Sequence, residues 1–295
     1  MRAHLKNFAD KLIEAIEVKG NPCMVGLDPR LDQIPHFVEG DIETKLFVFN
    51  KIIIDTVYDI IPTIKLQFAF YIQYGLAGVN AFKKSIDYAK AKGLIVVVDT
   101  KSNDIGSTAE AYAQAFIGVY PESFNADAVT VTPYLGSDGI IPFVKLCKEQ
   151  GKGIFVLVKT SNKSSGEFQD KIFVDTNEAL YKSVAKMVNE LGGDVVGGKG
   201  YSSIGAVVGA TYPTQASELR KIMPHALFLV PGYGAQGGTA EDTLPCFNED
   251  TLGAIIHSSR AIIFTENLTI SQADYTNFVR TNTEKMIAGI NSVLL

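Results

Sequence analysis

Three charged residues at the end of one apolar run could carry proton chemistry. Asp99 and Lys101 lie two positions apart directly after Val96–Val98, and Asp104 follows three positions later. If the backbone stays extended past the strand end, the side chains of Asp99 and Lys101 project to the same side. Neighbouring carboxylates keep a lysine protonated, and they oppose further negative charge unless the reaction removes it, as loss of a carboxylate does. A surface ion-pair cluster, with Asp104 capping a helix, is the simpler alternative.

A second segment, PGYGAQGG (Pro231–Gly238), could bind a phosphate. Glycines let backbone N–H groups approach an anion. Arg260 follows the next apolar run, and its guanidinium can bind a phosphate bidentately. Barrel enzymes often hold phosphate after the seventh and eighth strands, where these segments fall. Alternatively, the glycines only shape a mobile loop and Arg260 pairs with an acidic neighbour.

Eight short apolar runs, separated by longer segments of helical periodicity, are expected to position these residues as alternating βα units. The predicted strands are Met24–Leu27, Thr63–Leu66, Leu94–Val98, Ala128–Val131, Ile154–Val158, Ile204–Val208, Leu227–Val230 and Ala254–His257. Upstream, apolar residues at helical spacing within positions 5–16 predict a first helix rather than a signal peptide. Because no linker or composition break divides the chain, residues 1–295 are predicted to form a single (β/α)8 TIM barrel domain. A doubly wound sheet is the alternative.

Polar or glycine-rich residues lie at or just after the end of every predicted strand, and a barrel would gather them at its C-terminal mouth. In strand order they are Asp28, Lys65, Asp99 with Lys101, Thr132, Thr160–Asn162, Gly209–Thr211, Gly232–Gly238 and Ser258–Arg260. Each alone could be a turn former or a helix cap. Together they predict one site.

Composition excludes several classes of function. The net charge of −5 argues against a broad basic face for nucleic acid or an anionic membrane. The three cysteines are too scattered for a disulfide framework or a zinc site, which favours a reduced cytoplasm. The four histidines lack metal-ligand spacing and are expected to be surface or packed residues. Leu191–Ser203 is glycine-rich but lacks the order of a dinucleotide-binding fingerprint. With neither metal-ligand spacing nor such a fingerprint, the sequence predicts no metal and no other cofactor.

Over nearly its whole length the chain resembles orotidine 5'-phosphate decarboxylases of the longer bacterial form. The motifs are MVGLDPR (Met24–Arg30), TIKLQFAFY (Thr63–Tyr71), DTKSNDIGSTAEAYA (Asp99–Ala113), GAVVGAT (Gly205–Thr211), PGYGAQGG and SSRAIIF (Ser258–Phe264). Sister sugar-phosphate enzymes share the D-x-K-x-x-D core, whereas the ordered set is more specific. The resemblance implies cofactor-free conversion of orotidine 5'-phosphate to UMP and carbon dioxide in pyrimidine biosynthesis.

By that resemblance Lys65, Asp99, Lys101 and Asp104 form the alternating network around the reacting carbon. Lys101 would protonate a carbanion at pyrimidine C6, and Asp99 would crowd the substrate carboxylate. Thr132 stands where related sequences often carry asparagine, so no catalytic role is assigned to it.

The resemblance also implies binding roles and a homodimer. Asp28 and Lys65 would hold ribose hydroxyls. Gly234, Gln236 and Arg260 would hold the phosphate, with the loop 232–238 closing over it. Asp104, Ile105 and Thr108 would reach into the neighbouring subunit's site.

Three alternatives remain open from the sequence. Lys159, at the end of a predicted strand, could form a Schiff base in an aldolase. A metal-dependent sugar-phosphate decarboxylase or synthase of the same barrel group would carry a metal-binding acidic residue where this chain has Lys65. A catalytically silent nucleotide-binding protein would keep only the phosphate site.

Overall fold

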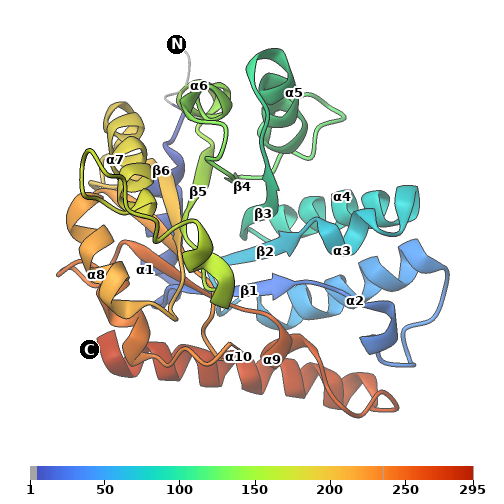
Figure 1. Cartoon of the computed structure of the whole chain (residues 1–295). Helices are drawn as coiled ribbons and strands as arrows, with labels where there is room; N and C mark the ends of the chain where they lie inside the picture. The colour runs from blue at the N-terminus through green and yellow to red at the C-terminus, as the bar shows by residue number, and fades with distance from the viewer. Residues whose placement is uncertain (1–4, 235, 295) are drawn as a thin grey trace.

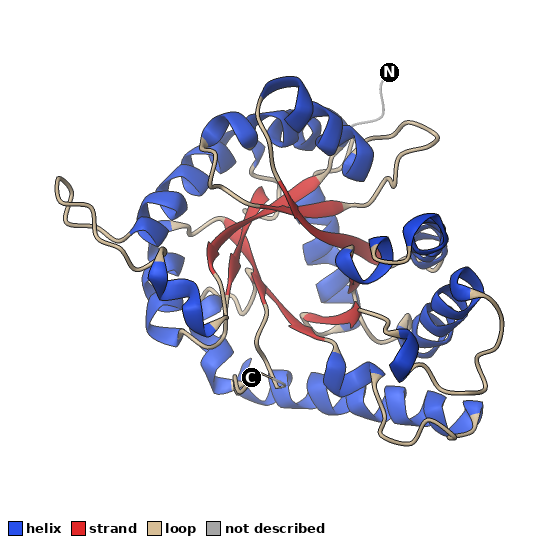
Figure 2. Cartoon of the chain, turned by 45° about the vertical axis from the view of Figure 1, so that its right-hand side comes forward, coloured by secondary structure: helices blue, strands red, loops and turns tan. Residues whose placement is uncertain are grey.

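The chain folds into a closed barrel of eight parallel strands, ordered β1 to β8 and surrounded by helices (Figures 1 and 2). The computed structural model describes residues 5–234 and 236–294, and the predicted surface or packed position of His4 lies outside this range. The strands are β1 (Cys23–Leu27), β2 (Thr63–Gln67), β3 (Ile95–Ser102), β4 (Ala128–Val131), β5 (Gly153–Lys159), β6 (Ser202–Val208), β7 (Ala226–Val230) and β8 (Ala254–Ser258). The predicted barrel is confirmed and the doubly wound sheet is wrong. The largest boundary difference is in β3, which continues to Ser102.

Helix α1 precedes the first strand, and the other helices follow the strands around the outside of the barrel. They are α1 (Phe8–Lys19), α2 (Ile42–Val57), α3 (Ala69–Ile72), α4 (Gly75–Ala91), α5 (Gly106–Ile117), α6 (Ile141–Gln150), α7 (Leu180–Gly192), α8 (Pro213–Ile222), α9 (Arg260–Ile263) and α10 (Gln272–Leu294). Short 3-10 helices are η1 (Leu31–Gln33), η2 (Ser137–Gly139), η3 (Lys163–Glu167), η4 (Gly193–Val195) and η5 (Glu241–Cys246). None of the helices within the described residues combines the length and apolar character needed to cross a bilayer.

The strands read as nearly continuous apolar runs because both of their faces are covered. β1, β4, β6 and β7 are buried at every position. Outward-facing side chains pack against the helices, and inward-facing ones fill the barrel, as in other parallel barrels.

The N-terminal end of the barrel is closed by α1, the predicted first helix. Its buried residues Phe8, Leu12 and Ile13 pack with Phe155 of β5 in one apolar cluster. The rings of Phe8 and Phe155 meet edge to face with centroids 6.0 Å apart. These four side chains have almost no exposed surface, so this end of the barrel interior is filled by apolar groups.

Toward the C-terminal mouth the inward-facing positions change from apolar to polar. Along β3 the inward series runs from Val97 to Asp99, and along β8 from Ile255 to His257. In the register of β2 with β3, Gln67 lies opposite Asp99. The alternation of side chains along a strand therefore places a polar layer above the apolar one.

A projecting arm, residues 169–181, leaves the mouth between β5 and α7 (yellow-green in Figure 1). Its two sides are joined by backbone hydrogen bonds from Tyr181 N to Gln169 O and from Leu180 N to Lys171 O. Val174, near its tip, is fully exposed. The arm is a local structure that adds no strand to the barrel.

Candidate active site

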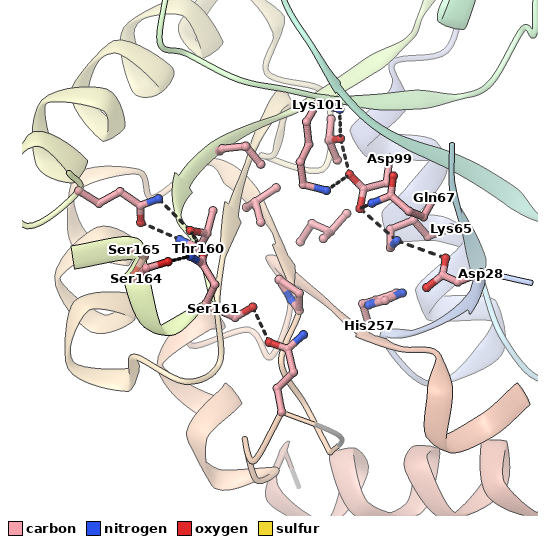
Figure 3. A pocket seen from close by; sticks show the side chains of 18 of the residues that line it. Asp28, Lys65, Gln67, Asp99, Lys101, Thr160, Ser161, Ser164, Ser165 and His257 are labelled. Atoms are coloured by element: carbon pink, nitrogen blue, oxygen red, sulfur yellow. Dashed lines mark hydrogen bonds and ion pairs between the residues drawn. The ribbon is translucent and has the colours of Figure 1, made fainter. Parts of the chain in front are cut away.

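Asp99 is the centre of the polar layer at the barrel mouth. Its Oδ2 accepts hydrogen bonds from Lys65 Nζ at 3.1 Å and Gln67 Nε2 at 3.0 Å. Its Oδ1 accepts from Lys101 Nζ at 2.6 Å and Thr130 Oγ1 at 2.7 Å. Figure 3 shows Lys65, Gln67 and Lys101 converging on this carboxylate. Four donors from three strands thus fix one anion.

The cations keep the buried Asp99 ionised. Burial alone would raise the pKa of the Asp99 carboxyl, but Lys65 and Lys101 hold it well below its usual range. Burial alone would likewise lower the pKa of Lys65, but Asp28 and Asp99 raise it. Asp28 Oδ1 lies 3.9 Å from Lys65 Nζ. Opposite charges therefore favour the charged forms of both Lys65 and Asp99 in spite of their burial.

The backbone at Lys101 is unusual. Its φ is +51°, so the chain is not extended there, contrary to the sequence-based expectation. Thr130 Oγ1 accepts from the backbone N–H groups of Thr100 and Lys101, both at 3.1 Å. A left-handed conformation is uncommon for a residue other than glycine and is maintained here by tertiary contacts. The turn still brings the Lys101 ammonium against Asp99.

Asp104 lies apart from this network within one chain. Its Oδ1 accepts from Ile105 N at 2.7 Å, just before α5 begins at Gly106. Lys101 is therefore held by one carboxylate of its own chain rather than two. Ile105 and Thr108 are exposed, and neither they nor Asp104 line the cavity beside Asp99.

Two adjoining cavities open at the mouth. The larger, about 600 Å³, lies between the Asp99 network and the loop after β5. The hydroxyl and amide groups of Thr160, Ser161 and Gln169 line its far side, so the predicted placement of Thr160–Asn162 at the site is confirmed. The smaller, about 240 Å³, lies beside Arg260.

The predicted phosphate-binding residues are only partly brought together. Gly232, Gln236 and Arg260 line the smaller cavity. Among the described residues no carboxylate lies within ion-pair distance of Arg260, so its guanidinium is available to an anion. Gln236 Oε1 accepts from Ser161 Oγ at 2.8 Å, which joins the loop 232–238 to the segment that follows β5. The Gly234 N–H donates to Gly238 O at 2.9 Å and is already used within the loop.

Lys159 is built into the wall rather than the site. Its fully buried ammonium binds Asp170 at 2.6 Å and Ser165 at 3.3 Å, and lies over the ring of Tyr212 at 4.4 Å. It does not line the larger cavity. A Schiff-base lysine must reach a carbonyl substrate, so this placement does not support the aldolase alternative.

Three polar residues at the site were given no role from the sequence. Gln67 and Thr130 bind Asp99, and His257 lines both cavities. Gln67 and Thr130 lie inside apolar runs. The only signal for them in the sequence is the alternation of side chains along β2 and β4, which places both residues on the inner face of the barrel. His257 is packed against β1 beside Gly26, as expected of a surface or packed residue, and it also lines the cavities.

Comparison with known families identifies the group to which this barrel belongs. The model of the orotidine 5'-phosphate decarboxylase / HUMPS family matches residues 48–270. The chain belongs to this family. The region matched by the family model includes the charged residues of the barrel mouth described above. Asp28 lies outside it.

Individual members of the orotidine 5'-phosphate decarboxylase / HUMPS family align with nearly the whole chain. The orotidine 5'-phosphate decarboxylase of Rhodopirellula baltica is 45% identical over 88% of this chain and 89% of that protein. That of Caldicellulosiruptor saccharolyticus is 41% identical over 95% and 93%. The structure of Leishmania donovani OMP decarboxylase superposes with a TM-score of 0.78 at 28% identity, covering 98% of both chains.

Proposed function

We propose that this chain decarboxylates orotidine 5'-phosphate to UMP and carbon dioxide, as a carboxy-lyase of pyrimidine biosynthesis. The observation that carries the proposal is the buried Lys65, Asp99 and Lys101 network beside a cavity of about 600 Å³. A second cavity adjoins it and suits the phosphate, because Arg260 lines it and forms no ion pair within residues 5–234 and 236–294. Family membership and relatives of that name at 41 and 45% identity support the same activity.

The two cavities give the nucleotide one orientation. The phosphate lies beside Arg260 and Gln236, and the pyrimidine lies in the larger cavity with C6 toward Lys101. The ribose then lies by the half-buried Asp28 and the buried Lys65, whose charged groups can bind its hydroxyls. Phosphate binding far from C6 helps to hold the reacting carbon in place, so part of that binding energy serves the chemistry.

The reaction breaks the bond between C6 and the substrate carboxylate. The electron pair of that bond stays on C6 as carbon dioxide departs. Lys101 gives one proton from its ammonium group to C6, which forms the C–H bond of UMP and leaves a neutral amine that solvent reprotonates. The cation of Lys101 stabilises the negative charge as it develops on C6.

Asp99 opposes the substrate but not the product. Its pKa is held low by Lys65 and Lys101, so the carboxylate remains ionised when a second anion is brought close. Repulsion between the two carboxylates ends when carbon dioxide leaves. Four hydrogen bonds prevent Asp99 from turning away. Gln67 and Thr130 thus act as positioning residues for Asp99.

Asp104, Ile105 and Thr108 complete the site of a partner subunit in a homodimer. They are adjacent to the site in sequence but do not line the cavity of their own chain. The exposed apolar side chains of Ile105 and Tyr112 on this segment suit burial against a second copy. Asp104 would then give the partner's Lys101 its second carboxylate.

The activity is tested by following the ultraviolet absorbance of orotidine 5'-phosphate with purified protein treated exhaustively with EDTA. We expect rapid conversion to UMP that is insensitive to the chelator. Folded protein without turnover would refute the proposal, and turnover lost to EDTA and restored by a divalent metal would favour the sugar-phosphate alternative. That alternative also needs an acidic side chain where Lys65 lies, and no three His, Cys, Asp or Glu of residues 5–234 and 236–294 form a metal-binding group.

The shared site is tested by mixing two inactive variants, Lys101→Ala and Asp104→Ala. In a mixed dimer one site receives both substitutions and the other receives none. Random exchange of subunits therefore restores about a quarter of the wild-type activity. No recovery after verified exchange would place Asp104 in the site of its own chain or outside any site.

A further inference from the structure

The far wall of the larger cavity is one continuous segment, residues 160–169, which follows β5. All residues of this wall segment except Lys163 and Gly166 line the cavity. Figure 3 shows labelled residues of the segment on one side of the cavity, with Asp99 and Lys101 on the other. Under the proposed function the wall segment therefore faces the pyrimidine, and its conformation decides how well the base fits.

The wall segment has no apolar anchor. Within residues 160–169, all of which are described, Ser165 alone is buried, and Phe168 is 66% exposed. The two ends are joined by hydrogen bonds, since Gln169 Oε1 accepts from Thr160 N at 3.0 Å and Gln169 Nε2 donates to Thr160 Oγ1 at 2.8 Å. A segment with few buried apolar contacts opens easily unless other interactions hold it. Polar contacts must therefore fix its conformation.

Lys159 lies directly behind the wall segment and supplies a charge to these contacts. Its fully buried Nζ donates to Ser165 Oγ at 3.3 Å and to Asp170 Oδ1 at 2.6 Å. Ser165 is in the middle of the segment, and Asp170 follows its last residue. Hydrogen bonds from a charged donor are about twice as strong as neutral ones. The ammonium group thus joins the end of β5 to the middle and the far end of the segment.

Tyr212, in the connection between β6 and α8, contacts both Lys159 and the wall segment. Lys159 Nζ lies 4.4 Å from the centroid of its ring, within the range of a cation–π interaction. Tyr212 Oη donates to Asn162 O at 3.1 Å and accepts from Ser165 Oγ at 3.3 Å. The contacts of Lys159 therefore connect the wall segment to two neighbouring strands of the barrel.

The burial of Lys159 has no explanation in the reaction itself, because its side chain does not line the cavity. Desolvation of an ammonium group is unfavourable, and a buried ion pair adds little net stability over apolar side chains of the same volume. Its best attested use is to select one arrangement of the groups that it joins. The groups joined here belong to the wall of the site.

We propose that Lys159 is a positioning residue for the base: it holds the wall segment in the conformation that fits the pyrimidine. It acts through Ser165, Asp170 and Tyr212 and does not touch the substrate. No covalent step is involved. The inference rests on the proposed function, which places the base against this wall. Loss of the ammonium group should therefore weaken binding of the base much more than binding of the phosphate.

The test compares two ligands that differ by the base. Calorimetry measures the affinities of the wild type, Lys159→Met and Lys182→Met for UMP and for ribose 5-phosphate. Lys159→Met should bind UMP at least about tenfold more weakly and ribose 5-phosphate within about twofold of the wild type. Lys182→Met is the matched control, because Lys182 also lies over the ring of Tyr181 but pairs with Glu218 at the surface. It should change neither affinity.

A second measurement needs no nucleotide. Lys163 is exposed within the wall segment, and trypsin can cut after it only when the segment opens locally. Mass spectrometry should show this cut several-fold faster in Lys159→Met than in the wild type, and at the wild-type rate in Lys182→Met. If Lys159→Met does not fold, Asp170→Asn carries both comparisons with smaller effects. It removes the charge of a half-exposed side chain and keeps an acceptor for Lys159.

Two results would overturn the role of Lys159. One is an affinity for UMP that stays within about twofold of the wild type, and the other is an equal loss for both ligands, which would indicate damage to the whole mouth. Failure of the proposed function is distinguishable from both. A wild type that neither binds UMP nor decarboxylates orotidine 5'-phosphate would refute that function, whereas faster trypsin cleavage of Lys159→Met would still show that Lys159 holds the segment.

Discussion

Lysines and aspartates are clustered at both ends of the barrel, and the two clusters are built differently. The mouth cluster is Asp28, Lys65, Asp99 and Lys101, and the floor cluster is Lys11, Lys90, Asp127 and Lys152. In the mouth cluster two lysines share two carboxylates that face a cavity. In the floor cluster the lysines bind mostly backbone carbonyls, and a single carboxylate is present.

The charged groups of the floor cluster form hydrogen bonds with other groups of the protein. Lys152 Nζ donates to Asn125 Oδ1 at 2.6 Å and to Ala126 O at 2.8 Å. Asp127 Oδ2 accepts from Val96 N at 2.9 Å. Burial, followed by repulsion from Lys90, lowers the pKa of Lys152 to about 8. Here ionisable residues join strand ends, which suits the N-terminal face of a barrel.

The charged groups of the mouth cluster lie beside a cavity, where they can interact with a ligand. Burial acts on Lys65 as it does on Lys152, but two neighbouring carboxylates reverse the effect and raise the pKa of Lys65. The ratio of carboxylates to lysines, together with access to a cavity, therefore separates a reactive cluster from a structural one. Burial alone does not.

The largest expected effect is the loss of the proton donor. Lys101→Ala should lower kcat by about 10²–10⁴-fold, the usual contribution of a general acid, while UMP binding persists. Steady-state kinetics measures the fall in kcat, and calorimetry measures whether the affinity for UMP persists. Lys152→Met is the matched control from the floor cluster and should leave kcat unchanged. A Lys101→Ala enzyme within tenfold of the wild type would remove the distinction between the two clusters.

Arg260→Ala should act through the phosphate. Loss of a charge-assisted bidentate contact should raise KM by about 10–100-fold. With orotidine, which lacks the phosphate, wild type and variant should differ little. Arg280→Ala, which removes a surface pair with Asp59, is the control and should change neither KM. Equal losses on both substrates would show that Arg260 acts on the fold or on the pyrimidine instead.

Asp127→Ala should affect stability rather than chemistry. It leaves the buried Val96 N–H without its acceptor and should lower the free energy of unfolding by about 1–3 kcal/mol. Asp127→Asn keeps an acceptor oxygen and should recover much of this loss. Urea unfolding measures both variants, and kcat should stay at the wild-type value. A fall in kcat without a loss of stability would contradict a structural floor cluster.

The smallest expected effect is a pH dependence of stability that arises from Lys152. Its folded pKa of about 8 lies below its usual 10.5, so between these values the unfolded chain binds more protons. The free energy of unfolding of the wild type, relative to Lys152→Met, should therefore rise with pH across this window, on the order of 1 kcal/mol. Denaturant titrations at pH 7.5, 9 and 10 check the sign. A relative fall would mean that Lys152 remains charged throughout.

The positions of the strands and of the charged residues could be predicted from sequence because each depends on local pattern. Buried parallel strands appear as short apolar runs, and polar residues at their ends mark the mouth. Gln67, Thr130 and His257 could not be assigned, because their roles depend on which strand faces which. The left-handed turn at Lys101 could not be predicted, since it depends on Thr130 across the β3 and β4 pair. Gly26 gains its meaning only beside His257.

The projecting arm offers a practical place to divide the chain. A cut beside Val174 would separate β1–β5, with Lys65, Asp99 and Lys101, from β6–β8, with Arg260. Neither fragment alone would contain both the proton donor, Lys101, and the phosphate-binding residue, Arg260. Fused to two interacting proteins, the halves would form a reporter whose signal is nucleotide turnover. The background activity of either half would be low, because each lacks site residues that the other contains.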